Sequence, residues 1–401
     1  MLTTAEALDA VLAATSAAAT EIVATSLSTG RVLQQTVRAE RDQPPFDRVM
    51  MDGIAFAFAD FDEETRELHV QAMQAAGDRV MNLQSGYCIE IMTGAALPVG
   101  ADTIVPVERI SIVDGRATIA DDCNVQKHRF IHPRGSDYAV GAHLLTAGKR
   151  ISPLDIAIIE SCGLTEVEVA ADPLIRVIST GNELVAAGQP IEDHQIRMSN
   201  GPAILSLLSN HGYHRSEHEH IPDDKDSLRV RLSAHLEHAN VIVLSGGVSM
   251  GKADYVPEIL AQLGVQRIFH RISQRPGKPM WFGKGPNGQL VFALPGNPVS
   301  ALVCCRHYVI PSLGRAAGAI AAAPEFAALS SSVAFKPDLT CFQPVRLLSS
   351  AAGQVLAMPV KTNTSGDFAS LSATDGYVEL PKEQTEFAAG TPVFLYRWTA
   401  R

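Results

Sequence analysis

Acidic residues stand in several loops that follow predicted strands or precede predicted helices. They are Asp52, Asp137, Glu183, Asp223 and Asp254. In an open parallel sheet the carboxyl ends of the strands face the ligand crevice, which predicts that Glu183 and Asp254 lie at one rim. Carboxylates at such a rim are suited to hold Mg²⁺ against a phosphate. Each residue taken singly is also of a type that caps helices and forms turns, so both interpretations stay open at this point.

A basic stretch contrasts with these acids, although the chain as a whole is acidic. From residue 259 to residue 324 there is no Asp or Glu, and within this range cations crowd one loop while prolines shape a second. The residues concerned are Arg271, Arg275 and Lys278 in the first loop and Pro295, Asn297 and Pro298 in the second. Cations neutralise an oxyanion and prolines stiffen a loop, so a pocket for a small oxyanion or a phosphate is one interpretation. The other is a buried apolar half-domain whose few charges are simply basic.

The stretch VIVLSGGVSMGKADY (241–255) changes from an apolar, β-branched run to a loop of small residues. The run predicts a buried parallel strand, and Gly246 and Gly247 allow the backbone to approach a ligand closely. Such a loop, which includes Ser249, is a ready site for an anion. The spacing almost matches a Walker A loop, but Ala253 stands where a Ser or Thr would ligate magnesium, which argues against a P-loop NTPase.

Two further motifs are predicted to be structural. GKGPNG (283–288) matches the dinucleotide-binding fingerprint letter for letter, but it lies between two predicted strands and ends in Asn-Gly, which indicates a hairpin turn. His214, His218 and His220 suggest a metal site, and the last two share one face of a predicted strand. Their neighbours are solvent-loving, so a metal site is disfavoured.

The composition indicates a soluble, globular protein of several domains. Of 401 residues 46% are hydrophobic, and the formal net charge of −10 argues against a nucleic-acid or anionic-membrane binder, because a polyanion needs a basic face. The six cysteines include no CxxC pair and fit reduced core thiols. Glu6 and Asp9 stand where a signal peptide is basic, so we expect an amphipathic helix capped near Thr3 or Thr4 and a cytoplasmic protein. No apolar run reaches membrane-spanning length.

The hydrophobic pattern predicts the elements that must position these residues. The run 31–40 alternates like a strand, Asp52-Gly53 marks a tight turn, and short strands from residue 87 to about 146 indicate a small β-rich domain. From Leu174 a doubly wound α/β pattern begins. Its predicted strands are 174–180, 241–244, 267–273, 279–284 and 289–295, and its helices lie near 200–210 and 226–238 and begin near 255 and 298. An all-β module follows an alanine-rich linker.

Six blocks of the sequence carry a resemblance to a known family. They are PPFDRVMMDG (44–53), MTGAALPVGADTIVPVE (92–108), STGNEL (179–184), SGGVSMGKADY (245–255), PGKP (276–279) and ALPGNPVSA (293–301). Taken together they resemble the molybdopterin molybdenumtransferase family, the MoeA and gephyrin E-domain group. The match covers nearly the whole chain in order.

The resemblance implies a multidomain fold of α/β plus β type. The implied domains are an elongated linker domain (1–26 and 147–170), a β-rich domain inserted in it (27–146), a molybdopterin-binding-like α/β domain (171–322) and a C-terminal β-barrel (325–401). Family members are similar in forming dimers whose active site lies between the α/β domain of one subunit and the β-rich domain of the other. A homodimer is therefore implied.

The implied reaction takes adenylylated molybdopterin and molybdate, inserts molybdenum into the dithiolene and releases AMP with the help of Mg²⁺. Residues that match the family's positions needed for activity are Asp52, Thr93, Asp137, Glu183, Asp223 and Asp254, of which the last three are the implied metal ligands. The implied substrate-binding residues are Gly246, Gly247, Ser249, Arg271, Arg275, Lys278, Pro295, Asn297, Pro298 and Ser365. Implied partners are a molybdopterin adenylyltransferase and the apo-molybdoenzymes that receive the product.

The chain departs from the family pattern at several polar loop positions. Val49 replaces a residue with a hydroxyl, and Asn182, Met198 and Lys252 stand where carboxylates are usual. These losses leave two alternatives open. One is a non-catalytic relative that binds molybdopterin or its metal-loaded form and hands it to an apo-enzyme. The other is a molybdopterin adenylyltransferase, whose fold is similar to the α/β domain, although the additional domains argue against it.

Overall fold

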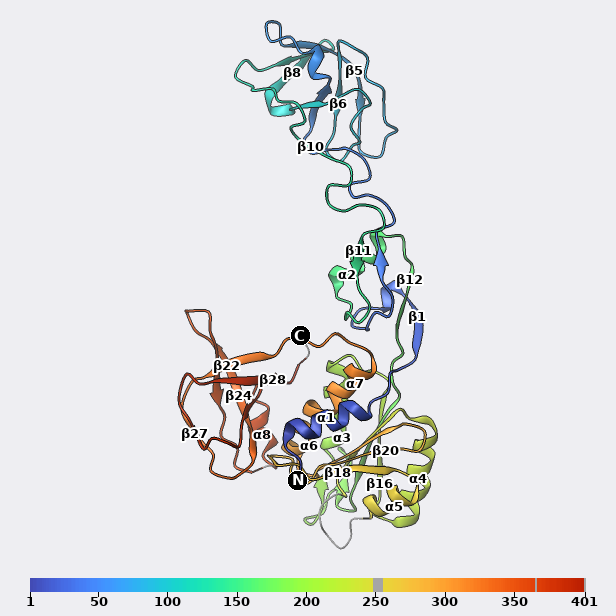
Figure 1. Cartoon of the computed structure of the whole chain (residues 1–401), viewed down its shortest axis with the longest axis vertical. Helices are drawn as coiled ribbons and strands as arrows, with labels where there is room; N and C mark the ends of the chain where they lie inside the picture. Colours follow the sequence, from blue (N-terminus) through green and yellow to red (C-terminus); the bar gives the residue numbers. More distant parts are fainter. Residues whose placement is uncertain (248–254, 365, 400–401) are drawn as a thin grey trace. The chain divides into compact units, whose positions relative to one another are not determined.

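The computed structural model describes residues 1–247, 255–364 and 366–399. The chain forms two compact units, which Figure 1 lets the reader follow by colour along the sequence. Unit 1 comprises Met1–Gln34, Gly148–Ser152 and Val167–Arg401, and unit 2 comprises Gln35–Ala147 and Pro153–Glu166. Within the described ranges no helix is both long and apolar enough to cross a membrane.

Unit 2 is built on a six-stranded sheet in the order β7-β4-β6-β5-β9-β8. Its strands are β4 (Gly53–Phe56), β5 (Glu67–Gln74), β6 (Tyr87–Ile91), β7 (Thr103–Pro106), β8 (Ile110–Val113) and β9 (Arg116–Ile119). Successive side chains of a strand point to opposite faces, so Ile54 and Ala55 enter two different apolar clusters. Two short antiparallel pairs, the helix α2 and two 3₁₀ turns complete the unit. They are β2 (Val37–Arg38) with β11 (His143–Leu145), β3 (Arg48–Val49) with β10 (Ile131–His132), α2 (Pro153–Ser161), η2 (Phe58–Asp60) and η3 (Val107–Arg109).

The α/β part of unit 1 is a six-stranded sheet in the order β16-β13-β17-β21-β20-β18. Its strands are β13 (Ile175–Thr180), β16 (Ser216–Ile221), β17 (Val241–Ser245), β18 (Gln266–His270), β20 (Trp281–Lys284) and β21 (Leu290–Leu294). The first four strands in the sheet order are parallel, while β20 runs antiparallel to both of its neighbours. The predicted strands and the GKGPNG hairpin turn between β20 and β21 are thereby confirmed, except that β18 ends at His270 and does not reach residue 273.

Helices cover both faces of this sheet (Figure 1). One face carries α1 (Thr4–Ala14), α3 (Asn200–Asn210), α6 (Pro298–Cys304) and α7 (Ile310–Ala316), and the other carries α4 (Lys225–His238) and α5 (Val256–Gln262). The predicted capping of α1 is confirmed, because Thr3 and Glu6 form a reciprocal capping box. The apolar helix predicted from Pro298 is interrupted by one π-helical turn, Cys305–Val309. Small pairs are β1 (Thr20–Ala24) with β12 (Glu166–Ala170) and β14 (Leu184–Val185) with β15 (Ile196–Arg197), and η1 (Thr25–Leu27) follows β1.

The C-terminal part of unit 1 is a closed five-stranded barrel in the order β24-β25-β22-β28-β26 and back to β24. Its strands are β22 (Glu325–Leu329), β24 (Thr340–Ser349), β25 (Val355–Pro359), β26 (Gly376–Leu380) and β28 (Pro392–Arg397). The short elements are β19 (Gln274–Arg275), which adds to β24, β23 (Val333–Ala334) with β27 (Glu386–Phe387), and α8 (Phe368–Leu371).

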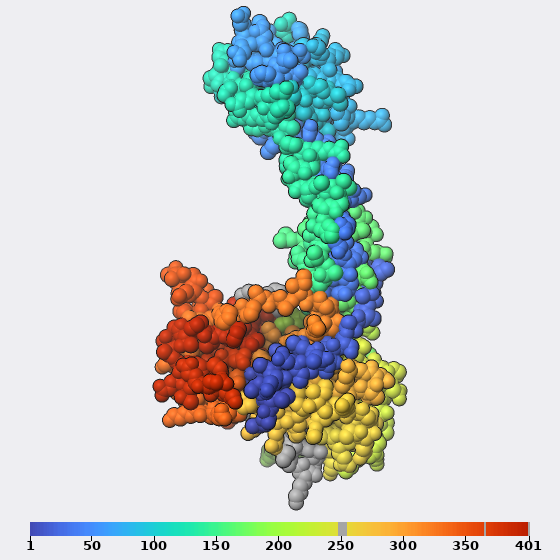
Figure 2. All heavy atoms as spheres, viewed as in Figure 1, coloured from blue at the N-terminus to red at the C-terminus, as the bar shows by residue number. Residues whose placement is uncertain are grey.

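The first residues of the chain lie on the surface along the junction of the α/β part and the barrel, as Figure 2 shows. Leu2 forms a β-bridge with Ile272, and the Thr4 hydroxyl donates to Glu379 of the barrel. The N-terminal segment therefore ties these two parts of unit 1 together.

The predicted strand over residues 31–40 is wrong as a single element. Val32 and Leu33 pair with Arg150 and Val169 in unit 1, whereas the second half of the run contributes only β2 to unit 2. An alternating hydrophobic pattern indicates that one face of an extended segment is buried. It does not show that the two halves of the segment pack against different units. On either side of Asp52-Gly53, β3 and β4 pair with other strands and do not form a hairpin with each other.

Candidate functional site

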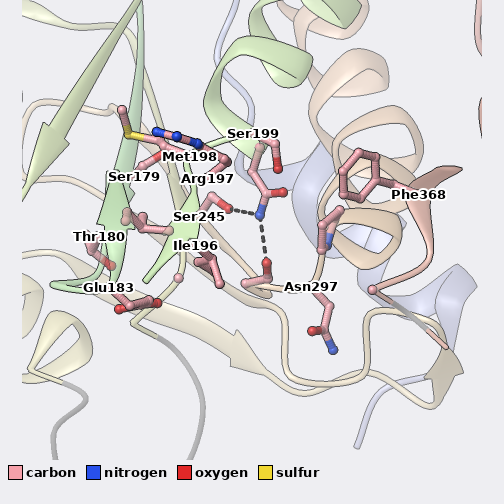
Figure 3. A pocket seen from close by; sticks show the side chains of 16 residues that line it. Ser179, Thr180, Glu183, Ile196, Arg197, Met198, Ser199, Ser245, Asn297 and Phe368 are labelled. Atoms are coloured by element: carbon pink, nitrogen blue, oxygen red, sulfur yellow. Dashed lines mark hydrogen bonds between the residues drawn. The ribbon is translucent and has the colours of Figure 1, made fainter. Parts of the chain in front are cut away.

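A pocket of about 400 Å³ opens at the carboxyl ends of the parallel strands in unit 1 (Figure 3). Its walls come from the ends of β13 and β17, from the loop between β21 and α6, and from the segment around α8. The lining residues are Ser179, Thr180, Glu183, Leu184, Ile196, Arg197, Met198, Ser199, Asn200, Ser245, Gly246, Gly296, Asn297, Pro298, Gly366 and Phe368. In the sheet β13 lies between β16 and β17, and the chain leaves β13 and β17 toward opposite faces. The pocket therefore lies at the switch point where open α/β sheets bind ligands.

Glycines let the backbone close in around this pocket. A Cβ atom on Gly246 would lie 2.6 Å from the Thr180 carbonyl oxygen, and its φ of 100° is a conformation that other residues rarely adopt. A Cβ atom on Gly181 would lie 2.6 Å from a carboxylate oxygen of Glu183. Only glycine at position 181 thus lets the Glu183 side chain fold back over its own loop.

Asn200, at the start of α3, fixes two strand ends across the pocket. Its side-chain amide donates to the Ser245 hydroxyl at 2.9 Å and to the Gly296 carbonyl at 2.7 Å, drawn as dashed lines in Figure 3. This amide holds the loops after β17 and β21 together. The barrel side contributes the half-exposed ring of Phe368, an apolar surface next to these polar groups.

The two described carboxylates of the predicted metal site come from neighbouring loops. Glu183 is exposed and lines the pocket after β13, and Asp223 follows β16. The Asn182 side-chain oxygen accepts a hydrogen bond from the Asp223 backbone N–H at 3.1 Å, which joins the two loops. Among the described residues no three His, Cys, Asp or Glu side chains gather closely enough to hold a metal ion. The third predicted ligand, Asp254, lies outside the described residues.

The predicted anion-binding residues fall into two groups. Asn297 and Pro298 line the pocket, and Pro295 is buried just after β21. The cations Arg271, Arg275 and Lys278 are not part of its lining. Arg275 and Lys278 are exposed on the segment that adds β19 to the barrel, and none of the three forms an ion pair within the described part of the chain.

Asp52 and Thr93 of unit 2 are in direct contact. Both the backbone N–H and the hydroxyl of Thr93 donate to Asp52 Oδ1 at 2.6 Å. The hydroxyl bond first, and then the backbone bond, lower the pKa of the Asp52 carboxyl. Asp52 is therefore an ionised, exposed carboxylate at neutral pH, and Thr93 holds its Oδ1 in place.

Asp137 follows β10 in unit 2. Asp52 and Asp137 follow opposite ends of the antiparallel pair β3–β10. His132 contacts Asp137 Oδ1 through Nε2 at 3.0 Å, and Arg48 contacts the other ring nitrogen of His132 at 3.0 Å. The carboxylate is thus held by a chain of two basic side chains.

The positions of Ser249, Asp254 and Ser365 lie outside the described residues. Gly247 directly follows Gly246 but does not line the pocket. Sequence reasoning missed Asn200 and Phe368, which do line it. The Asn in RMSNG directly precedes a predicted helix, which was an available signal for the first of these, whereas nothing near Phe368 marked it.

Two histidines of the predicted cluster form contacts within the protein. His218 Nε2 contacts the Ser179 hydroxyl at 2.9 Å, and His220 Nε2 contacts the Gly181 carbonyl at 2.9 Å. Both histidines on β16 therefore support the end of β13, which carries the pocket wall.

Family models and known proteins cover the chain in the same order as these structural parts. Three family models match: the MoeA N-terminal region (domain I and II) over residues 2–163, a probable molybdopterin binding domain over residues 176–315, and the MoeA C-terminal region (domain IV) over residues 327–398.

Curated proteins and solved structures match over almost the full length. A protein from Synechocystis sp. named molybdopterin molybdenumtransferase is 38% identical, over 92% of this chain and 93% of its own. One of the same name from Synechococcus elongatus is 34% identical, over 92% of each chain. The crystal structure of a molybdopterin biosynthesis MoeA protein from Pyrococcus horikoshii has a TM-score of 0.83 at 28% identity and covers 100% of both chains.

Proposed function

The chain belongs to the MoeA family of molybdopterin molybdenumtransferases, transferases of molybdenum cofactor biosynthesis, and from this premise we propose that it inserts molybdate into adenylylated molybdopterin with release of AMP. The observation that carries the proposal is the pocket at the carboxyl ends of β13 and β17, which Glu183 and Gly246 both line. Its volume of about 400 Å³ lies within the range of small-molecule sites. Polar groups at fixed positions and the Phe368 ring suit a ligand with both a flat ring and phosphates.

Mg²⁺ is part of the proposal because the donor chemistry fits it. Glu183 and Asp223 supply hard carboxylate oxygens from two loops that the Asn182 side chain joins. We propose these two residues and Asp254 as its ligands. When bound, the ion would neutralise charge on the phosphate oxygens of the substrate. The protein itself would hold the phosphates beside Glu183, close to the backbone of Gly246. Asn200 would hold the loops after β17 and β21 in place.

Molybdate is a dianion, and we propose that Arg271, Arg275 and Lys278 attract it. These cations have no ion-pair partners in the described part of the chain, so their charge is available to an oxyanion. Pro295, Asn297 and Pro298 would shape the loop beside it. We further assign Gly246, Gly247, Ser249 and Ser365 to substrate binding, and Asp52, Thr93 and Asp137 of unit 2 to activity.

The test of the proposed reaction is AMP release from adenylylated molybdopterin and Mg²⁺, with and without molybdate. Molybdate-dependent release is expected from the unmodified chain, and Glu183→Gln is expected to lose most of it, since an amide is a far weaker magnesium ligand than a carboxylate. Glu237→Gln, at an exposed position on α4, is the matched control and should retain full release. Tight binding of adenylylated molybdopterin with no AMP release would contradict the transferase. It would favour the non-catalytic relative that hands molybdopterin to an apo-enzyme. Consumption of ATP to adenylylate molybdopterin would identify an adenylyltransferase.

The role of the cations has its own test. Arg275→Ala should raise the molybdate concentration needed for half-maximal AMP release by roughly fivefold, because an exposed charge contributes at most about 1 kcal/mol. Its affinity for molybdopterin should stay unchanged. Arg267→Ala, which removes an exposed arginine of β18, is the control. A loss of molybdopterin affinity with an unchanged molybdate requirement would show that Arg275 has been assigned to the wrong ligand.

The family resemblance also supports further proposals about the protein's surroundings. We propose a cytoplasmic homodimer that receives its substrate from a molybdopterin adenylyltransferase and delivers its product to apo-molybdoenzymes. We propose the four domains with the boundaries given above, 1–26 with 147–170, 27–146, 171–322 and 325–401. Sedimentation velocity at micromolar concentration tests the dimer, since a monomeric mass would exclude it.

A further inference from the structure

The hydroxyl of Thr180 is a buried polar group without a partner. Thr180 is the last residue of β13 and is only 3% exposed. Its Oγ1 forms no hydrogen bond among the residues that the structure describes. An unsatisfied buried hydroxyl destabilises a protein, because it has given up its hydrogen bonds to water and gained none in return. Such a group needs an explanation in what it does for function.

Thr180 lines the pocket at the carboxyl ends of the strands, between Ser179 and Glu183 (Figure 3). The backbone after β17 passes close to the Thr180 hydroxyl. A Cβ atom on Gly246 would lie 3.1 Å from Thr180 Oγ1, and one on Gly247 would lie 3.0 Å from it. Glycine at both positions keeps side-chain atoms away from the hydroxyl.

Three polar groups close to Thr180 are satisfied within the protein. The Ser179 hydroxyl contacts His218, the Gly181 carbonyl contacts His220, and the Ser245 hydroxyl accepts from Asn200. Thr180 differs from them although it lies in the same wall. The fold supplies partners for the groups that hold the pocket together, and it leaves this one unsatisfied.

We propose that the Thr180 hydroxyl donates a hydrogen bond to a phosphate oxygen of the bound substrate. A phosphate oxygen is a small and strong acceptor, and the positive φ of Gly246 and Gly247 gives a close backbone approach of the kind used around phosphates. The inference rests on the proposed function, since it takes the phosphate-bearing substrate from there. It adds a substrate-binding residue outside the set that the sequence indicated.

Two substitutions at this position separate the hydroxyl from the shape of the side chain. Thr180→Val replaces the hydroxyl with a methyl group of similar size, and Thr180→Ser keeps the hydroxyl. The probes are AMP and adenosine, which differ by the phosphate alone, measured by calorimetry on the full chain with Mg²⁺. Thr180→Val should weaken AMP binding by about tenfold, the value of one hydrogen bond to a charged group, and leave adenosine binding unchanged. Thr180→Ser should bind AMP within about twofold of the unmodified chain.

The stability of the ligand-free protein provides a second measurement. Thr180→Val should weaken AMP binding but stabilise the protein without ligand. Without ligand, Thr180→Val should raise the melting temperature by about 1–4 °C, because it removes an unsatisfied polar group. A fall in the melting temperature would mean that the hydroxyl has a partner within the protein, which would overturn the proposal. Unchanged AMP affinity in Thr180→Val, or equal losses for AMP and adenosine, would also overturn it.

The two proposals can fail separately. Molybdate-dependent AMP release from the unmodified chain decides the proposed function without reference to Thr180. If that release is absent while AMP still binds, the calorimetric comparison of the valine and serine variants decides the role of the hydroxyl by itself.

Discussion

At the scale of single residues, hydrogen-bonding rules fix the state of His132 in unit 2. Arg48 has only N–H donors, so His132 Nδ1 must accept the bond that joins them at 3.0 Å. The proton of the neutral ring then resides on Nε2, which donates to Asp137 Oδ1 at 3.0 Å. Arg48 therefore selects the tautomer that can hold Asp137, and both residues position a carboxylate that we assign to activity.

The first prediction concerns a variant without the Arg48 guanidinium, which selects the His132 tautomer. Arg48→Met should release His132 into a mixture of tautomers, visible in the ¹⁵N shifts of its ring in nuclear magnetic resonance spectra. Molybdate-dependent AMP release should fall about fivefold, the effect of losing one hydrogen bond of about 1 kcal/mol. Arg38→Met, at an exposed position on β2, is the control. If the His132 tautomer stays uniform in Arg48→Met, the positioning role is refuted, whatever happens to activity.

At the scale of elements, the fit of α3 against β16 governs the pocket wall. A Cβ atom on Gly201 would lie 2.1 Å from His218 Nε2, the atom that contacts Ser179. Only glycine at this position lets the helix approach the edge strand closely. Gly314 of α7 provides the matched contrast, because a Cβ atom there would meet nothing within 4 Å.

The second prediction compares alanine at these two helical glycines. Gly201→Ala should lower the free energy of unfolding by about 1–3 kcal/mol through overpacking, in spite of the higher helix propensity of alanine. Gly314→Ala should raise it by up to about 1 kcal/mol, because only the propensity changes there. Urea unfolding of both variants measures the difference. Equal effects of the same sign would mean that His218 moves aside at no cost.

How far the sequence predicts the structure depends on whether local pattern or distant packing decides a feature. The strands β13 and β17 and the helices α3 and α4 have strong periodicity or clear caps, and their predicted ranges agree with the structure within a few residues. The run 31–40 was misread because its two halves bury against different units. For the pocket, the strand-end rule and the family resemblance identified Glu183, Gly246, Asn297 and Pro298. Thr180 and Phe368 could not be chosen, because an unsatisfied hydroxyl and a ring from another part of unit 1 are visible only in three dimensions.

At the scale of the whole molecule, buried histidines couple the stability of unit 1 to pH. Burial, with a further contribution from the nearby Arg306 charge, lowers the pKa of His307 to about 3 and that of His211 to about 4. Both lie where the α/β part meets the barrel. His307 packs among aromatic rings, with its Nδ1 at 3.2 Å from the Tyr377 hydroxyl, and His211 Nε2 lies 3.0 Å from the Trp398 carbonyl.

The sign of the pH dependence follows from where protons bind. In the unfolded chain these histidines take up protons below about pH 6.5, whereas the folded protein keeps them neutral down to about pH 4 and pH 3. The unfolded state therefore binds more protons in this window, and the stability of unit 1 should fall as the pH drops below about 6.5. Each histidine contributes up to about 1.4 kcal/mol per pH unit.

The third prediction is that His211→Gln flattens this slope between pH 6.5 and pH 5, where the carboxylates with lowered pKa values are still ionised. Both tryptophans of the chain, Trp281 and Trp398, belong to unit 1, so tryptophan fluorescence during urea unfolding reports on this unit alone. His238→Gln, at an exposed position on α4, should leave the slope unchanged. An unaltered slope in His211→Gln would mean that this histidine is protonated in the folded protein, and that the junction between the α/β part and the barrel admits the charge.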